Sequence, residues 1–234
     1  MQIENSVVLV TGANRGIGLA FAQALLARGA RKVYAAARDP STVTLPGVQP
    51  LQLDVTKPDD IAAAVRQAGD VNLVINNAGI AQPGGFLAPD SDAVARRIFE
   101  TNFFGVLNVT RAFAPVLKAN GGGALLNVLS VASWVNGGEL AAYSASKSAA
   151  WSLTNALRHE LAGQKTQVTG LHMAYVDTDL TRGFEVPKTS AEEIVQRALD
   201  GLAAGAEEVL ADALTQQIRQ GLTAARPVYL PQVG

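Results

Sequence analysis

Val7-Val-Leu-Val-Thr11, continuing into Gly12-Ala-Asn-Arg-Gly16-Ile-Gly18, is the stretch that decides the fold. The apolar run is typical of a strand buried on both faces of a parallel sheet. The glycines allow a tight turn and a close approach of backbone to a ligand. They open a helix predicted over 16–29, whose first N–H groups lack partners and favour an anion. A strand, glycine turn and helix in this order predict pyrophosphate binding within a βαβ unit; alternatively, the turn only connects the two elements.

Strand-like apolar runs alternate with helix-like segments through most of the chain. This alternation predicts an α/β fold with a doubly wound, Rossmann-like parallel sheet of about seven strands and helices on both faces. With no linker or repeat, residues 1–234 are expected to form one domain. Strands are predicted near 6–11, 32–37, 50–55, 71–76, 123–130, 166–174 and 207–211. Helices are predicted near 16–29, 58–68, 91–119, 144–162, 190–204 and 212–223.

Composition excludes several classes of function. The net charge of −1 and the lack of a basic run argue against nucleic-acid binding. The chain has no cysteine, and His159 and His172 are too far apart for a short metal motif, so no metal site is expected. His172 fits a core histidine in a strand, and His159 a surface cation near a helix end. Without a signal-like leader or a membrane-length apolar run, a cytoplasmic protein without membrane partners is expected.

A second informative stretch is Tyr143-Ser-Ala-Ser-Lys147, with Ser130 thirteen residues upstream of the tyrosine. One helical turn separates the phenol from the amine, so both project from the same helix face. A cation beside a phenol stabilises phenolate and lowers the pKa of the phenol, which otherwise lies near ~10. Such a pair suits proton exchange with a ligand, although taken alone it is more often a solvated surface pair.

With these motifs in place, the chain resembles the short single-domain branch of the short-chain dehydrogenase/reductase family. The glycine loop matches that family's cofactor loop, and Asn76-Asn77-Ala78-Gly79 matches a second fingerprint that stabilises the central sheet. The resemblance covers roughly residues 5 to 180. It implies a catalytic tetrad of Asn102, Ser130, Tyr143 and Lys147.

The resemblance implies a role for each member of the tetrad. Tyr143 would give a proton to a carbonyl during reduction or take one from an alcohol during oxidation. Ser130 would hydrogen-bond the carbonyl oxygen, with Ser133 as a rival three residues later. Lys147 would bind the nicotinamide ribose and, with oxidised nicotinamide, lower the phenol pKa. Asn102, in a long helix, would hold a water that links Lys147 to solvent. The cofactor itself would supply the hydride.

Charge near the adenosine ribose favours NADP(H) over NAD(H). Arg38 follows the predicted second strand and Arg15 lies in the glycine loop, so two guanidinium groups could clamp a 2′-phosphate. Alternatively, both are surface arginines and Asp39 binds the ribose hydroxyls of NAD. Asp54 could accept a hydrogen bond from the adenine amino group. The residues expected at the cofactor are Gly12, Asn14, Arg15, Gly16, Ile17, Gly18, Arg38, Asp54, Val55, Asn77, Ala78, Gly79, Tyr143, Lys147, Val176 and Thr178.

The chain departs from the family after the sixth strand, where the usual Pro-Gly is missing and Tyr175 stands beside the expected nicotinamide pocket. Residues 180–188 are expected to form a short substrate lid, with Phe184 as its only aromatic residue. Trp134, near Phe86 and Leu140, either lines the substrate pocket or anchors a loop. The residues expected at the substrate are Ser130, Trp134, Tyr143, Tyr175 and Phe184, and the apolar set favours aliphatic or aromatic carbonyls over polyols.

These features predict an NADP-dependent reductase of small ketones or aldehydes, reversible as an alcohol dehydrogenase. A non-catalytic dinucleotide sensor on the same fold is the alternative. A nucleotide-sugar epimerase or dehydratase would normally need a longer C-terminal domain. A homodimer through the helices at 91–119 and 144–162 is expected, with Trp151 as a contact, and a tetramer is less favoured.

Overall fold

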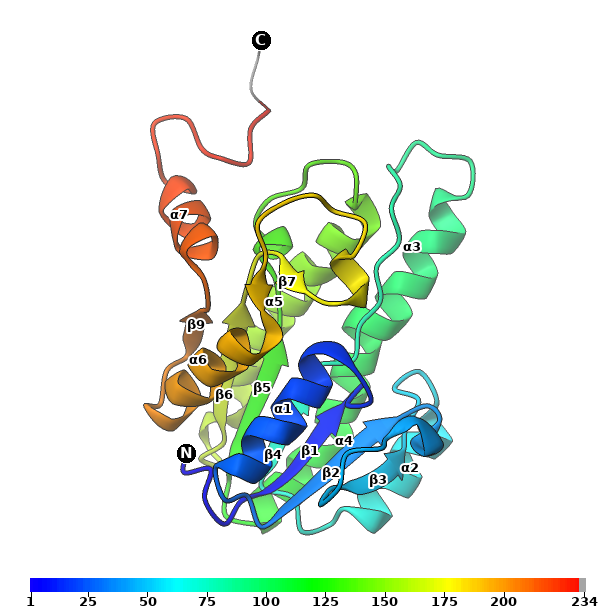
Figure 1. Cartoon of the computed structure of the whole chain (residues 1–234), viewed down its shortest axis with the longest axis vertical. Helices are drawn as coiled ribbons and strands as arrows, with labels where there is room; N and C mark the ends of the chain where they lie inside the picture. Colours follow the sequence, from blue (N-terminus) through cyan, green and yellow to red (C-terminus); the bar gives the residue numbers. More distant parts are fainter. Residues whose placement is uncertain (232–234) are drawn as a thin grey trace.

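The computed structural model describes residues 1–231, which fold around a seven-stranded sheet (Figure 1). All neighbouring strands of this sheet pair in parallel, in the order β3-β2-β1-β4-β5-β6-β9. The predicted doubly wound Rossmann-like fold is therefore confirmed. The strands are β1 (Val7–Thr11), β2 (Lys32–Ala37), β3 (Gln49–Gln52), β4 (Leu73–Asn76), β5 (Ala124–Val128), β6 (Gln167–His172) and β9 (Glu208–Leu210).

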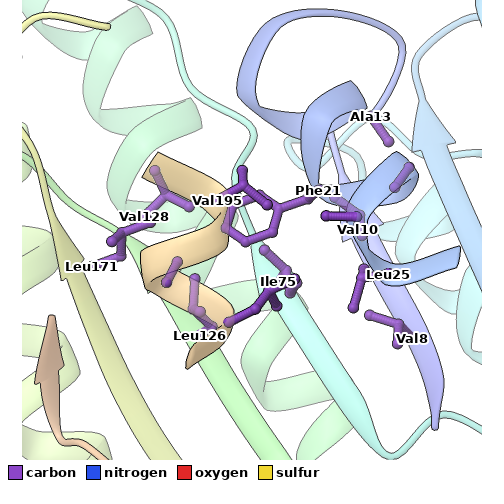
Figure 2. Packing of buried hydrophobic residues seen from close by; sticks show 14 of the residues in the cluster. Val8, Val10, Ala13, Phe21, Leu25, Ile75, Leu126, Val128, Leu171 and Val195 are labelled. Carbon is purple, nitrogen blue, oxygen red and sulfur yellow. The ribbon is translucent and has the colours of Figure 1, made fainter. Parts of the chain in front are cut away.

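Helices cover both faces of the sheet because successive strand residues point to opposite sides. Val8 and Val10 pack in one buried cluster with α1 (Gly16–Ala27) and α6 (Ala191–Ala203). Figure 2 shows Phe21 of α1 and Val195 of α6 in this cluster. The alternate strand residues pack in a second cluster with α2 (Pro58–Gln67), α4 (Val106–Ala119) and α5 (Ala141–Ala162). The remaining α-helices of residues 1–231 are α3 (Ser91–Phe99) and α7 (Ala213–Gly221).

The prediction of a single long helix over 91–119 was wrong in one respect. A π-helical segment, η2 (Glu100–Gly105), separates α3 from α4. The carboxamide of Asn102 in this segment bonds both the N–H and the C=O of Ile80, each at 2.9 Å, and so ties the wide turn to the loop after β4. π-Segments of this kind are often found at functional sites, and the apolar pattern of the sequence does not distinguish them from α-helix.

A second, two-stranded sheet pairs β7 (Val176–Asp177) with β8 (Thr189–Ser190) in parallel. The pair closes the segment between these strands, which includes the short helical turn η4 (Asp179–Thr181), into a loop beside the carboxyl end of the main sheet. Two-residue strands leave no periodic signal, so the sequence did not predict them. Within residues 1–231, no helix combines the length and apolar character needed to cross a bilayer.

The order of the strands fixes where a ligand binds. The chain leaves β1 toward β2 on one side of the sheet, whereas β4 leads to β5 on the other side. The connections that leave the neighbouring strands β1 and β4 therefore run in opposite directions. Open α/β sheets bind ligands at such a switch point, beyond the carboxyl ends of the strands.

Candidate active site

A cleft of about 810 Å³ opens at the carboxyl ends of the central strands. Its walls come from the ends of β1, β2, β4 and β5, from α5 and from the loop after β6. It brings together most of the residues that the sequence suggested for the cofactor and the chemistry. Those in its lining are Gly12, Asn14, Arg15, Gly16, Ile17, Arg38, Asp54, Val55, Asn77, Ala78, Gly79, Ser130, Tyr143, Lys147, Val176 and Thr178.

The glycine loop has the conformation that an anion site requires. Gly12 (φ +67°) and Gly16 (φ +54°) lie in the left-handed region, which side-chain-bearing residues rarely adopt. A Cβ on Gly18 would overlap the carbonyl oxygen of Gly12, so helix and loop pack too closely for any side chain there. No side chain caps α1 at its N-cap, Arg15, and its first turn holds no acidic residue. Its N–H groups and its positive dipole end therefore suit a pyrophosphate.

Hydrogen bonds hold the two fingerprints together. The Asn77 side chain donates to the carbonyl oxygens of Thr11 (2.9 Å) and Gly12 (3.1 Å), while the Thr11 hydroxyl accepts from the N–H groups of Asn77 and Ala78. Deeper in the sheet, the Asn76 side chain donates to Asn127 at 2.9 Å. The glycine turn is thus fixed to β4, as a preorganised ligand site requires.

At the far end of the cleft, Arg38 follows the last residue of β2 and is exposed. The neighbouring Asp39 carboxylate accepts from the N–H (3.0 Å) and the hydroxyl (2.7 Å) of Ser41 and caps a short turn. These bonds lower the Asp39 pKa. One oxygen of this carboxylate, Oδ1, is therefore engaged with its own turn, and the cationic Arg38 occupies the position just beyond the strand.

Asp54 lies half-buried in the same wall. Its Oδ1 accepts from the backbone N–H (3.0 Å) and the hydroxyl (2.7 Å) of Thr56. Burial opposes ionisation of Asp54, but these two bonds outweigh it and hold its pKa below the usual value. The group is an anionic acceptor at neutral pH, with its second oxygen free of any Thr56 bond.

Tyr143 and Lys147 lie one turn apart on α5 and both line the cleft. The Lys147 Nζ sits 5.7 Å from the centroid of the Tyr143 ring and donates to the carbonyl oxygen of Val128 at 2.7 Å. Lys147 is buried (6% exposed), and burial lowers its pKa to about 8. One hydrogen bond leaves two of its three protons for a ligand in the cleft.

The sequence suggested that Lys147 lowers the phenol pKa, and the protein's own groups do not produce that effect. Burial raises the pKa of Tyr143, and its interaction with the Ser130 hydroxyl opposes the rise only in part. The phenol is therefore protonated at neutral pH, which suits a proton donor. Lowering its pKa for the reverse reaction requires a further positive charge beside it, such as oxidised nicotinamide.

The structure distinguishes the two candidate serines. Ser130 lines the cleft and forms the N-cap of the turn η3 (Val131–Ser133), where its Oγ accepts from the N–H of Ala132 at 3.1 Å. Ser133 is buried at the end of that turn and is absent from the cleft lining. Only Ser130 directs its hydroxyl toward the phenol.

Asn102 lies behind the cleft rather than in its lining. It is 1% exposed, and besides Ile80 its side chain donates to the Ser146 hydroxyl at 3.0 Å. A Cβ on Gly79 would lie 3.4 Å from the Asn102 Oδ1 and 3.8 Å from the Lys147 Nζ. Gly79 therefore separates Asn102 from the amine without filling the space between them.

Three residues suggested for the substrate lie outside the cleft lining. Tyr175 and Phe184 pack on each other, with ring centroids 5.6 Å apart, and are half-buried. Trp134 stacks on His172 at 4.1 Å, so it anchors its loop in place of lining the pocket. Trp151, suggested as a dimer contact, donates from its indole nitrogen to Glu208 at 3.1 Å within the chain. The partners in each of these contacts are separated along the chain, so the sequence around either residue could not predict the contact.

Two acidic residues shape the site without having been predicted. Asp212 accepts from the N–H of Ala174 at 2.8 Å and also caps α7, so it fixes the loop where the family usually has Pro-Gly. Asp179 pairs with Arg15 at 3.2 Å and thereby joins the turn η4 to the glycine loop. The N-cap position of Asp212 was readable from its place before a helix, but its bond to Ala174 spans 38 residues.

Comparison with known proteins gives a consistent result. The sequence model of the short chain dehydrogenase family matches residues 6–188. A short chain dehydrogenase of Burkholderia cenocepacia J2315, solved in complex with NADP, is 42% identical with a TM-score of 0.92, over 96% of this chain and 95% of that one. D-erythrulose reductase of Gallus gallus is 38% identical over 193 residues, 80% of this chain and 78% of that protein. A short chain dehydrogenase/reductase of Burkholderia phymatum, solved with NAD, has the same fold at 24% identity (TM-score 0.82, all of both chains).

Proposed function

The chain belongs to the short-chain dehydrogenase family of oxidoreductases, and from this membership we propose that it reduces a small ketone or aldehyde with NADPH. In reverse it is an alcohol dehydrogenase. The observation that carries the proposal is the meeting of the Tyr143 phenol, the Ser130 hydroxyl and the Lys147 ammonium in one cleft with a glycine-loop anion site. A dinucleotide sensor would not need a proton donor in this cleft.

Bound NADPH would supply the hydride, and the chain would supply position and a proton. Ser130 accepts from Ala132, so its own proton is available to the carbonyl oxygen of the substrate. Tyr143, protonated at neutral pH, gives its proton to that oxygen as negative charge develops on it. Lys147 holds the nicotinamide ribose with its free donors. Asn102, behind Gly79, orders the solvent path that returns a proton toward the amine.

We propose that the segment 180–188, of which Leu180 and Thr181 line the cleft, acts as a lid over the substrate. In this proposal, Ser130 and Tyr143 contact the substrate directly, and the packed pair Tyr175 and Phe184 stiffens the lid. Leu180, 51% exposed at the mouth of the cleft, adds an apolar surface. Together with Met173 in the lining, it favours small aliphatic or aromatic carbonyls. In this proposal the whole chain acts as one catalytic domain and pairs as a dimer through the helices at 91–119 and 144–162, which are α3, α4 and α5.

NADP(H) is the proposed cofactor. Arg38 beyond β2 and Arg15 in the glycine loop both line the cleft, and Arg15 also pairs with Asp179 at 3.2 Å. A 2′-phosphate fits this pair of guanidinium groups, because each can make charge-assisted hydrogen bonds to its oxygens. The relative of 42% identity that was solved with NADP supports the proposal.

Replacing Arg38 tests the cofactor assignment. Arg38→Ala should raise the KM for NADPH by about 10- to 150-fold, since charge-assisted hydrogen bonds contribute roughly 1.5–3 kcal/mol. The KM for NADH should change by less than about twofold, because NADH has no 2′-phosphate to lose. Steady-state kinetics with both cofactors gives the comparison. Arg31→Ala, an exposed arginine outside the cleft, is the matched control. Equal effects of Arg38→Ala on the two cofactors would refute the NADP assignment.

The activity itself is tested with a panel of aliphatic ketones, aldehydes and aryl ketones, followed by the fluorescence of NADPH or NADH. Turnover of at least one carbonyl, faster with NADPH, is expected. Binding of NADPH without turnover of any panel member, together with no oxidation of the matching alcohols, would favour the sensor.

A further inference from the structure

A buried aromatic and ionic cluster lies directly behind Ser130. Its centre is His172, the last residue of β6, which is 0% exposed. The imidazole stacks on the Trp134 ring with centroids 4.1 Å apart and planes at 21°, and Trp151 meets it edge-on at 6.5 Å. The ring is thus packed against two indoles, one stacked on it and one edge-on. The proposed reaction uses none of these three side chains.

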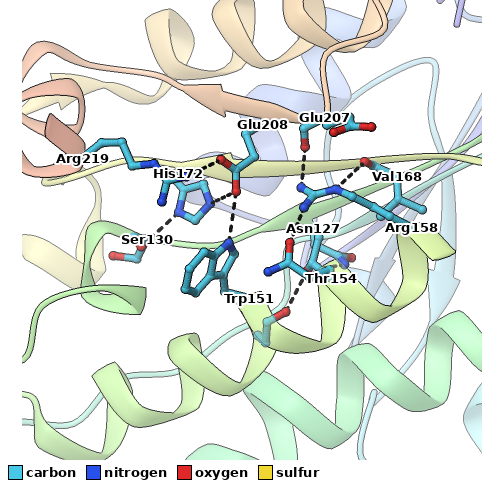
Figure 3. A network of polar contacts seen from close by, with 12 residues as sticks. Asn127, Ser130, Trp151, Thr154, Arg158, Val168, His172, Glu207, Glu208 and Arg219 are labelled. Carbon is cyan, nitrogen blue, oxygen red and sulfur yellow. Dashed lines mark hydrogen bonds and ion pairs between the residues drawn. The ribbon is translucent and has the colours of Figure 1, made fainter. Parts of the chain in front are cut away.

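Both nitrogens of the imidazole face oxygen atoms. Nδ1 lies 3.4 Å from the backbone carbonyl oxygen of Ser130, and Nε2 lies 3.7 Å from a carboxylate oxygen of Glu208 (Figure 3). A carbonyl oxygen can only accept, so Nδ1 must carry the proton in that contact. Interaction with His172, aided by the N–H of Trp151, holds the Glu208 pKa to about 2 in spite of its burial. At 3.7 Å from Glu208, Nε2 is beyond hydrogen-bond distance, and it is buried without a hydrogen-bond partner. Both contacts are attractive together only when each ring nitrogen carries a proton.

The C-terminal part of the chain closes the cluster. Glu208 comes from β9, and Arg219 comes from α7. The Arg219 guanidinium pairs with Glu208 at 3.4 Å and lies over both indoles, 5.1 Å from the centroid of Trp134 and 5.9 Å from that of Trp151. The cation–π contacts hold the guanidinium of Arg219 in place, and its ion pair in turn holds the carboxylate of Glu208 near the imidazole.

Two donors converge on the Ser130 carbonyl. The N–H of Ser133 bonds it at 3.0 Å from within the turn η3, and His172 approaches it from β6. The N–H of Val131, which belongs to the same peptide unit as the Ser130 carbonyl, donates to Met173 at 2.9 Å, and the N–H of Leu129 donates to Leu171 at 2.8 Å. The histidine adds a second donor at the carbonyl oxygen, on the side of the peptide from which the Ser130 side chain extends. A hydroxyl aimed at a substrate oxygen depends on the orientation of that peptide, and small misplacements of such groups strongly slow catalysis.

We propose that His172 is a positioning residue that orients Ser130 through its backbone carbonyl, and that Glu208 and Arg219 of the C-terminal segment hold His172 in place. The inference rests on the proposed role of Ser130 in carbonyl reduction.

Two substitutions separate the two ring nitrogens. Asparagine places its amide nitrogen near the position of Nδ1, so His172→Asn keeps the donor toward Ser130. Glutamine reaches toward the position of Nε2, so His172→Gln keeps the contact with Glu208 and loses the donor toward Ser130. His172→Gln should lower kcat by about tenfold with less than about threefold change in the carbonyl KM, and His172→Asn should stay within about threefold of the parent. His159→Asn, at an exposed position, is the matched control.

Three measurements make the result decisive. Rates are expressed per NADPH-binding site, so that loss of folded protein is not read as loss of rate. Ser130→Ala is made alone and with His172→Gln. If His172 acts through Ser130, the second change has no further effect on kcat once the hydroxyl is gone. The expected pattern is loss in the Gln variant, retention in the Asn variant and no added loss in the double variant. Equal rates for the Gln and Asn variants, or a full extra loss in the double variant, would overturn the inference. Parent-like kcat in Ser130→Ala would instead overturn the proposed role of Ser130.

Discussion

Tyr143→Phe reduces kcat for carbonyl reduction by about a thousandfold or more and leaves the Kd for NADPH within about threefold of the parent. The reason is that the substitution removes one hydroxyl and keeps the ring. The phenol has a pKa raised by burial, and its loss takes away the proton that the developing alkoxide needs. The anion site for the cofactor, in contrast, is built from the glycine loop and the start of α1. Stopped-flow or steady-state rates, with NADPH binding followed by fluorescence quenching, measure both quantities.

The control for this variant is Tyr229→Phe, which makes the same chemical change at an exposed position after α7. It should be indistinguishable from the parent in both rate and binding. Residual reductase activity of Tyr143→Phe within tenfold of the parent would remove the phenol from its assigned role. A large loss of NADPH binding would show that the hydroxyl serves the cofactor instead.

Lys147→Met should inactivate the enzyme and also stabilise it. Burial lowers the Lys147 pKa from 10.5 to about 8. That difference means that the buried, protonated amine destabilises the folded state by roughly 3 kcal/mol at neutral pH. Methionine carries no charge, so it removes this destabilisation. It also loses the hydrogen bond to Val128, which contributes about 1 kcal/mol. A rise in Tm of about 4–8 °C at pH 7 is expected, with kcat lowered at least about a hundredfold.

The stability difference between Lys147→Met and the parent should depend on pH, and its direction follows from the shifted pKa of Lys147. The folded-state pKa of Lys147 lies below its unfolded value, so the cost of the charge is complete below pH 8. It declines as the pH rises from 8 to 10.5 and is absent above that window. The Tm advantage of Lys147→Met should therefore shrink between pH 8 and 10.5 in calorimetry. Lys118→Met, at an exposed site, should show no such change. If Lys147→Met were less stable than the parent, and by the same amount at pH 7 and at pH 10, the buried charge would not be destabilising as assigned.

The fold could be predicted because its signals are local and repeated. The apolar run of β1, the glycines that follow and the alternation of strands with helices each occupy a few consecutive residues. The same is true of Arg38, whose position just after β2 follows from the end of one apolar run. The segments that differ from prediction lack such a signal: the π-helical turn continues an apolar helix pattern, and β7 and β8 have two residues each.

Side-chain partners across the fold were harder to predict. Trp134 stands four residues after Ser130, and nothing nearby in the sequence says whether it faces the cleft or His172. The stacking of Trp134 on His172 depends on how β6 aligns with β5, and the bond of Trp151 to Glu208 depends on where β9 joins the sheet edge. The pKa of Tyr143 is another such case, because the sequence shows the nearby amine but not how deeply the phenol is buried.

The bond from Asp212 to Ala174 has a consequence for biosynthesis. The loop after β6 lines the cleft, yet the carboxylate that holds it lies 38 residues later in the chain. A nascent chain emerging from the ribosome therefore has its glycine loop and its phenol long before it has the acceptor for the Ala174 N–H. The hydrogen bond that fixes this loop therefore forms only after Asp212, the N-cap of α7, has been translated.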